Sequence, residues 1–132
     1  MAARVIPQPL LAVADVPRAS RWYRQLLGAA SGHGGEEYER VYVGDTLVLQ
    51  LHSLAVDHHH GPIGDPDQPL GNGVLVWFAL EDFDGAVKRS RAAEAEVVMD
   101  VHLNPNAGQR ELWLRDPDGY VVVVAEEHGS RP

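Results

Sequence analysis

The sequence predicts an α+β protein made of two βαβββ modules, and three observations predict it. Helical spacing of apolar residues occurs twice, each time after a short apolar run and an aspartate that can cap the helix. Strand-like segments follow each helix. The same order recurs at nearly constant shifts, since Asp15 maps on Asp82 at a shift of 67 and Asp45 maps on Asp118 at a shift of 73.

Length, charge and cysteine content narrow the class of protein. The 132 residues suit one domain with a real core. Eleven basic and nineteen acidic residues give a formal net charge of -8, which disfavours nucleic acid and anionic membranes as partners. Cysteine is absent, which excludes disulfides and thiolate chemistry, and no apolar run approaches the ~20 residues of a membrane span. We therefore expect a soluble, cytoplasmic protein.

The first module is expected at residues 4–54. Asp15 is the expected helix cap, and Gly28 ends the helix because glycine tolerates the left-handed conformation found there. Trp22 and Tyr23 should both lie in the core beneath this helix. The expected segments are a strand at 10–13, a helix up to residue 27, a loop at 29–38, and strands at 40–43 and 46–52.

The second module, residues 73–128, repeats this order after a connector at 55–72 that is rich in Gly, Pro, Asp and His. Glu94 stands where a glycine would be expected to end the second helix. The sequence Asp116-Pro117-Asp118-Gly119 predicts a tight turn. The expected segments are a strand at 74–80, a helix from 83, a strand at 96–101, a loop at 102–108, and strands at 110–114 and 120–125.

Three stretches, LLAVADVPRASRWYRQLLG, VWFALEDFDGAV and ELWLRDPDGYVVVVAEE, resemble the vicinal oxygen chelate superfamily. This superfamily includes glyoxalase I, bleomycin-resistance proteins, fosfomycin-resistance enzymes and extradiol dioxygenases. The resemblance covers nearly the whole chain. It implies paired modules whose curved mixed sheets enclose a cleft, with the helices outside, a small-molecule ligand, and a homodimer. Its members differ in chemistry, so the resemblance alone does not define a reaction.

Metal-dependent members of that superfamily take their ligands from the first and last strands of each module. Carried over to this sequence, those positions are Gln8, Gln50, Leu75 and Val123. Leu75 and Val123 have no donor atom, and a carboxamide is a weak substitute for a carboxylate or an imidazole. We therefore expect no metal at this position and no cofactor.

Strand alternation places further side chains beside these four positions and gives a largely apolar wall. Trp77 offers a flat face to a planar guest, although a plain core position suits it equally well. The sequence therefore favours a metal-free cleft for a small, partly aromatic molecule, as the resemblance to bleomycin-resistance proteins implies. The expected ligand-binding residues are Gln8, Leu10, Val48, Gln50, His52, Leu75, Trp77, Val121 and Val123.

An enzyme of the same superfamily, of lyase, isomerase or dioxygenase type, is the alternative. His52 and Glu111 are the candidate catalytic residues, because imidazole titrates near neutrality and a carboxylate can act as its acid–base partner. Glu111 could instead pair with a neighbouring arginine. A divalent metal relocated to His52, His102 and Glu111 is a second form of this alternative. The polar segment 102–108 predicts a ligand-gating loop or a simple turn, and His58-His59-His60 predicts adventitious metal binding.

Overall fold

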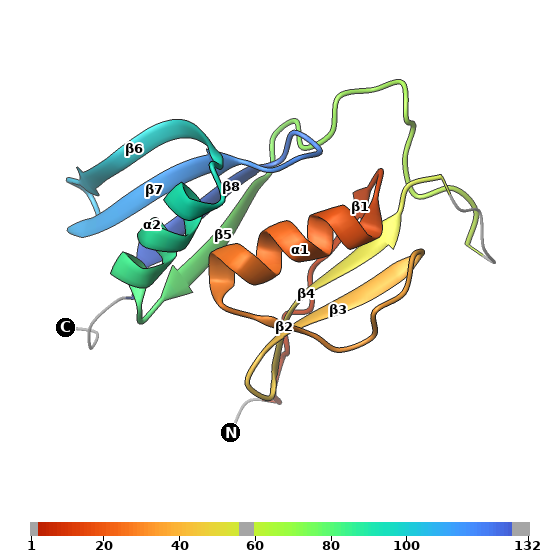
Figure 1. The fold of residues 1–132 in the computed structure, drawn as a ribbon, viewed down its shortest axis with the longest axis horizontal. Helices are drawn as coiled ribbons and strands as arrows, with labels where there is room; N and C mark the ends of the chain where they lie inside the picture. The colour runs from red at the N-terminus through yellow and green to blue at the C-terminus, as the bar shows by residue number, and fades with distance from the viewer. Residues whose placement is uncertain (1–2, 56–59, 128–132) are drawn as a thin grey trace. The chain divides into compact units, whose positions relative to one another are not determined.

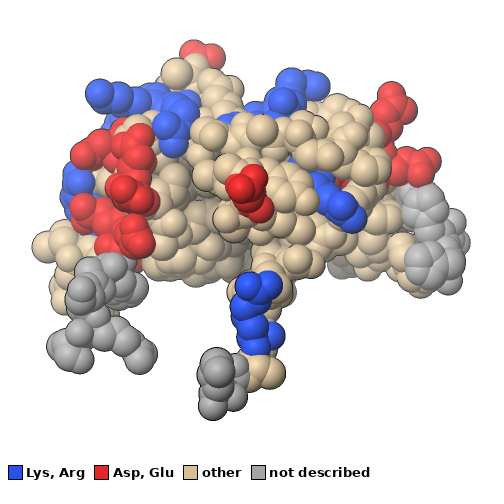
Figure 2. All heavy atoms as spheres, turned by 90° about the horizontal axis from the view of Figure 1, so that it is seen from below, with Lys and Arg blue, Asp and Glu red and all other residues tan. Residues whose placement is uncertain are grey.

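The computed structural model describes residues 3–55 and 60–127 and confirms the α+β class with two βαβββ modules (Figure 1). The chain divides into two compact units. Unit 1 comprises Met1–Arg24 and Ala29–Pro66, and unit 2 comprises Gln25–Gly28 and Asp67–Pro132. No helix within the described residues is long and apolar enough to span a membrane. The face seen in Figure 2 carries scattered basic side chains and a gathering of acidic ones.

Unit 1 contains a four-stranded sheet of order β1-β4-β3-β2, in which β1 runs parallel to β4 and the other pairs are antiparallel. The short strand β2 lies within the predicted loop at 29–38, so that part of the prediction was wrong. Nothing in an Ala-Ser pair signals a strand, and β2 exists because it pairs with β3. The elements are β1 (Leu10–Val13), α1 (Val16–Leu27), β2 (Ala30–Ser31), β3 (Tyr38–Val43) and β4 (Thr46–Ser53).

Helix α1 begins and ends as predicted. Asp15 Oδ1 accepts a hydrogen bond of 3.0 Å from the Arg18 backbone N–H, and Gly28 follows the last turn with φ +64°. Tyr23 is buried, as predicted, but Trp22 is only half-buried, and its ring meets that of Tyr23 edge-on at 4.9 Å. The core position predicted for Trp22 was therefore wrong, because its neighbour Tyr23 occupies the centre of the buried helix face.

A β-bulge interrupts the alternation between β3 and β4. Val41 pairs with Leu49, but the next residue, Tyr42, pairs with Leu47. Val48 is thus the extra residue of the bulge, and Leu47 shares a face with Tyr42. Strict alternation along β4, which placed Val48 beside Gln50 in the sequence analysis, does not hold at this point.

Glu39 is a buried carboxylate on β3, with 3% of the residue exposed. Burial by itself would raise its pKa, but hydrogen bonds led by that from the Gly34 backbone outweigh burial and lower the pKa from 4.5 to about 2. This ionised group ties α1 and the loop before β3 to the sheet. Its donors are Ser20 Oγ at 2.9 Å, Ser31 Oγ at 2.8 Å and the backbone N–H groups of His33 at 3.1 Å, Gly34 at 2.8 Å and Arg40 at 2.9 Å.

Unit 2 contains a second four-stranded sheet, of order β5-β8-β7-β6, with α2 packed against β5 and β8. Asp116 Oδ1 accepts from the backbone N–H groups of Asp118 and Tyr120, each at 2.9 Å, and closes the predicted turn between β7 and β8. The elements are β5 (Leu75–Leu80), α2 (Phe83–Ala92), β6 (Glu96–Asn104), β7 (Gln109–Arg115) and β8 (Val121–Glu126).

Strand β6 is longer than predicted and takes in the first three residues of the expected loop at 102–108. His102 pairs with Glu111, and Asn104 pairs with Gln109. The loop prediction was wrong for residues 102–104, because pairing with β7 decides their conformation rather than their polar side chains. Only the residues after Asn104 form the turn.

The backbone after the last turn of α2 is strained, whereas the backbone after the last turn of α1 is not. Glu94 adopts φ +52°, the only positive φ of a non-glycine residue in the described part of the chain. The Glu94 N–H donates to Arg91 O at 3.1 Å, and the Ala95 N–H donates to Ser90 O at 3.0 Å. These two bonds form the helix-ending motif that normally has glycine at this position. Glu94 therefore bears the left-handed conformation that Gly28 adopts without strain after α1.

Candidate functional site

One face of the unit 2 sheet carries a row of large apolar side chains that crosses all four strands. Trp77 on β5 pairs with Val123 on β8, Val123 pairs with Trp113 on β7, and Trp113 pairs with Met99 on β6. Directly paired residues point to the same side of a sheet. Val123 is completely buried between the two indoles, whereas Trp77 is 47% exposed. We call this surface the Trp77 face.

Two further rows flank this one. Toward one end, Leu75 and Val121 line up with Arg115 and Glu96, which form an ion pair of 2.8 Å. Toward the other end, the small residues Ala79 and Ala125 line up with Glu111 and His102. The two alanine side chains of this second row are short; Ala79 is exposed, and Ala125, which pairs with Glu111, is 1% exposed.

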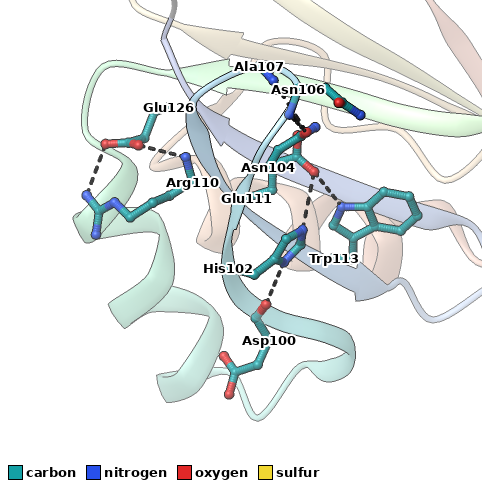
Figure 3. A network of polar contacts seen from close by, with 9 residues as sticks. All are labelled: Asp100, His102, Asn104, Asn106, Ala107, Arg110, Glu111, Trp113 and Glu126. Carbon is teal, nitrogen blue, oxygen red and sulfur yellow. Dashed lines mark hydrogen bonds and ion pairs between the residues drawn. The ribbon is translucent and has the colours of Figure 1, made fainter.

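Glu111 is 2% exposed. Its carboxylate is held by two donors, and Figure 3 shows the residues around it. Asn104 Nδ2 donates to Oε2 at 2.8 Å, and Trp113 Nε1 donates to Oε1 at 3.0 Å. Burial raises the pKa of Glu111, but these hydrogen bonds and the charge of His102 outweigh burial, so the net effect lowers the pKa. The Trp77 face therefore carries an ionised carboxylate.

His102 stands beside this carboxylate in a defined orientation. Its Nδ1 lies 2.8 Å from the carbonyl oxygen of Asp100, and its Nε2 lies 3.6 Å from Glu111 Oε1 (Figure 3). A carbonyl oxygen only accepts hydrogen bonds, so Nδ1 carries a proton. The Asp100 carboxylate is engaged separately, with Arg91 at 3.2 Å.

Neighbouring arginines do not neutralise Glu111. Arg110 pairs with Glu126 at 3.1 Å and with Asp84 at 3.2 Å, and its guanidinium lies over the Phe83 ring of α2. Arg115 pairs with Glu96, as described above. The alternative in which Glu111 pairs with Arg110 or Arg115 is therefore not the arrangement found.

Unit 1 has a cavity of about 710 Å³ against its own sheet. Gln8 and Gln50, two of the expected ligand-binding residues, line it, together with Leu47 from the bulge. Leu10, Val48 and His52 are not among the lining residues. The complete lining consists of Arg4, Val5, Ile6, Pro7, Gln8, Arg40, Tyr42, Asp45, Thr46, Leu47 and Gln50.

Both ends of the Gln50 amide are engaged. Its Oε1 accepts from the Tyr38 hydroxyl, and its Nε2 donates to the Gln8 carbonyl at 3.0 Å. The other superfamily positions, Leu75 and Val123, are hydrocarbon side chains. This donor set does not fit a divalent metal. Within residues 3–55 and 60–127, no three His, Asp or Glu side chains gather as potential ligands.

His52 is buried, and its Nδ1 lies 2.8 Å from the carbonyl oxygen of Ser53. Its ring meets that of His60 at 5.2 Å. His52 belongs to unit 1, whereas His102 and Glu111 belong to unit 2. His58 and His59 lie outside the described residues.

Trp113 is a residue of the Trp77 face that was not among the expected site residues. It is half-buried on the Trp77 face and donates to Glu111. The signal was available, because residues two apart on one strand share a face and Trp113 follows Glu111 by two. Glu111 itself is placed on this side of the sheet by its pairing with Ala125 on β8.

Two βαβββ units with open four-stranded sheets define the vicinal oxygen chelate class of protein. The chain belongs to the Glyoxalase/Bleomycin resistance protein/Dioxygenase superfamily, whose family model matches residues 5–124. A search of curated proteins finds no match.

Three solved structures illustrate the likeness of fold. TioX from Micromonospora sp. ML1 is 20% identical with a TM-score of 0.71, covering 95% of this chain and 100% of that one. Lactoylglutathione lyase from Agrobacterium tumefaciens is 22% identical with a TM-score of 0.68, covering 96% of each chain. The fosfomycin resistance protein FosX from Mesorhizobium loti is 14% identical with a TM-score of 0.63, covering 97% of this chain and 95% of that one. At these identities the likeness shows the fold alone.

Proposed function

We propose that this protein binds a small, partly aromatic molecule on the Trp77 face, with no metal at the superfamily's metal position. The observation that carries the proposal is the row of Trp77, Val123, Trp113 and Met99, in which a tryptophan remains 47% exposed. An exposed indole in an apolar row leaves area that a planar guest can bury. The description of the family that matches this chain includes bleomycin resistance proteins.

The charge beside the indoles indicates which guests fit. Glu111 is ionised, and it lies in the row next to Trp77 and Trp113. The chain as a whole carries a formal net charge of -8. A neutral or cationic aromatic molecule should therefore bind more tightly than an anionic one of the same size, because a carboxylate and the surrounding negative potential repel anions.

Tryptophan fluorescence tests the proposal. In a Trp22→Phe background, the two remaining tryptophans both report on the Trp77 face, and the probes are indole, quinoline and N-methylquinolinium. Trp77→Leu should weaken binding of these probes by about 1 to 3 kcal/mol if the indole stacks on them. Trp22→Phe alone is the matched control, because Trp22 lies on α1, and it should leave affinity unchanged. Unchanged affinity in Trp77→Leu would remove Trp77 from the binding surface.

We also propose a cytoplasmic homodimer, as the family resemblance implies. The apolar side chains exposed along the edge strand β6, among them Val97, Val98 and Leu103, are consistent with a contact between protein surfaces. Light scattering on the purified protein measures the mass directly. A mass of one chain at micromolar concentration would contradict the dimer and leave the binding proposal intact.

A further inference from the structure

We propose that His102 is a general base that removes a proton from the molecule bound on the Trp77 face, and that Glu111 is the residue that positions and supports it. This inference rests on the proposed function, since it needs a guest on that face. The ligand class it adds is a small aromatic compound with an acidified C–H, N–H or O–H group.

The hydrogen bond to Asp100 fixes the tautomer of the neutral His102 ring. Nδ1 donates to the Asp100 carbonyl at 2.8 Å, so the neutral ring has its lone pair on Nε2. Within the described residues Nε2 makes no hydrogen bond, and its ion-pair contact is Glu111 Oε1 at 3.6 Å. That distance exceeds a hydrogen bond, so Glu111 is not a hydrogen-bond partner of Nε2 in the neutral ring.

Glu111 stabilises the protonated form of His102. Once Nε2 takes a proton, the ring becomes an imidazolium 3.6 Å from a carboxylate. Glu111 is 2% exposed, and the attraction between opposite charges is stronger there than in open water. Asn104 and Trp113 hold the two carboxylate oxygens in place, so no reorganisation is needed when the charge forms.

His102 and Glu111 have different roles. Glu111 is a poor base itself, because its pKa is lowered and its oxygens already accept hydrogen bonds. The His102 side chain is 31% exposed, and it therefore remains accessible to a guest. His102 lies in the row next to Trp113, and rows on one face are about 7 Å apart, which is the width of a small aromatic ring system.

The ring opening of 5-nitrobenzisoxazole tests the base directly, because it needs no other reagent. His102 Nε2 takes the proton from C3, the C–H electron pair forms the second π bond of the new nitrile, and the N–O bond breaks with its electrons on oxygen. The product, 2-cyano-4-nitrophenolate, is coloured. The imidazolium then returns its proton to water.

His102→Ala should lower kcat/KM for this probe by at least about tenfold. Glu111→Gln should lower kcat with little change in KM, and Glu111→Asp should restore part of the rate, because aspartate keeps the charge that glutamine removes. The matched control is His33→Ala, which should leave the rate unchanged. His33 also has its Nδ1 near a backbone carbonyl, that of Tyr38 at 3.0 Å, but no carboxylate partner for its ring among the described residues.

Two measurements separate failure of this inference from failure of the proposed function. If the probe quenches the tryptophans and Trp77→Leu weakens that binding, yet His102→Ala turns over as fast as wild type, the base role is refuted and the binding proposal stands. Nitrogen-15 NMR of the histidine rings needs no ligand. It should show His102 with its proton on Nδ1 when neutral, and a proton on Nε2 instead would overturn the inference whether or not any probe binds.

Discussion

Replacing Glu39 with glutamine removes a negative charge that five hydrogen bonds support. The pKa of Glu39 falls from 4.5 to about 2 on folding, which is equivalent to about 3 kcal/mol of stability. Glutamine keeps one acceptor oxygen but turns an NH₂ group toward N–H and O–H donors. We therefore expect Glu39→Gln to lower the free energy of unfolding by about 3 kcal/mol at pH 7.

The contribution of Glu39 to the free energy of unfolding should decrease as the pH falls. Because the folded pKa lies below the unfolded one, the contribution of Glu39 is complete above pH 4.5 and is lost as the pH falls toward 2. Urea unfolding followed by fluorescence should therefore show a difference between wild type and Glu39→Gln that shrinks to about 1 kcal/mol at pH 3. Glu36→Gln, in the same loop with an exposed side chain, is the control. A difference at pH 7 below about 0.5 kcal/mol, or one that stays constant down to pH 3, would refute the reasoning.

Three other changes have defined outcomes. Glu94→Gly should raise the free energy of unfolding by about 0.5 to 1 kcal/mol, because φ is +52° at this residue. Ala93→Gly is the control, and it should lower the free energy of unfolding because φ is -81° there. A loss of stability in Glu94→Gly would contradict the strain at this helix end. Tyr23→Ala should cost about 3 to 5 kcal/mol in chemical denaturation, and a near-zero loss would show that the ring is not a core element. After a mild chelator wash, elemental analysis of a variant with alanine at 58–60 should find no stoichiometric metal, with Gln50→Ala making no difference; one tightly held metal per chain would overturn the metal-free cleft.

Local signals in the sequence were enough for most of the fold. The caps Asp15 and Asp82, the glycine at 28 and the Asp116 turn each act within a few residues of themselves, so their effects can be read without knowing the sheet. The absence of glycine at position 94 is also a local signal, because Glu94 adopts the left-handed conformation there.

Features that depend on pairing between strands could not be predicted in the same way. Strand β2 and the end of β6 form because a neighbouring strand offers hydrogen bonds. The bulge at Val48 depends on the register of β3 against β4. The contact between His102 and Glu111 joins two strands through their register, so the sequence could name both residues without showing that they are partners.

The hydrogen bond from Gln50 to the Gln8 carbonyl has a practical consequence for the unit 1 cavity. Residues 4–8, which belong to no helix or strand, form one wall of that cavity, and this bond helps to hold them against β4. The size of the cavity thus depends on residues 4–8 as well as on the sheet. A substitution within residues 4–8 would change the lining of the cavity, whereas the pairing of β1 and β3 with β4 does not involve those residues.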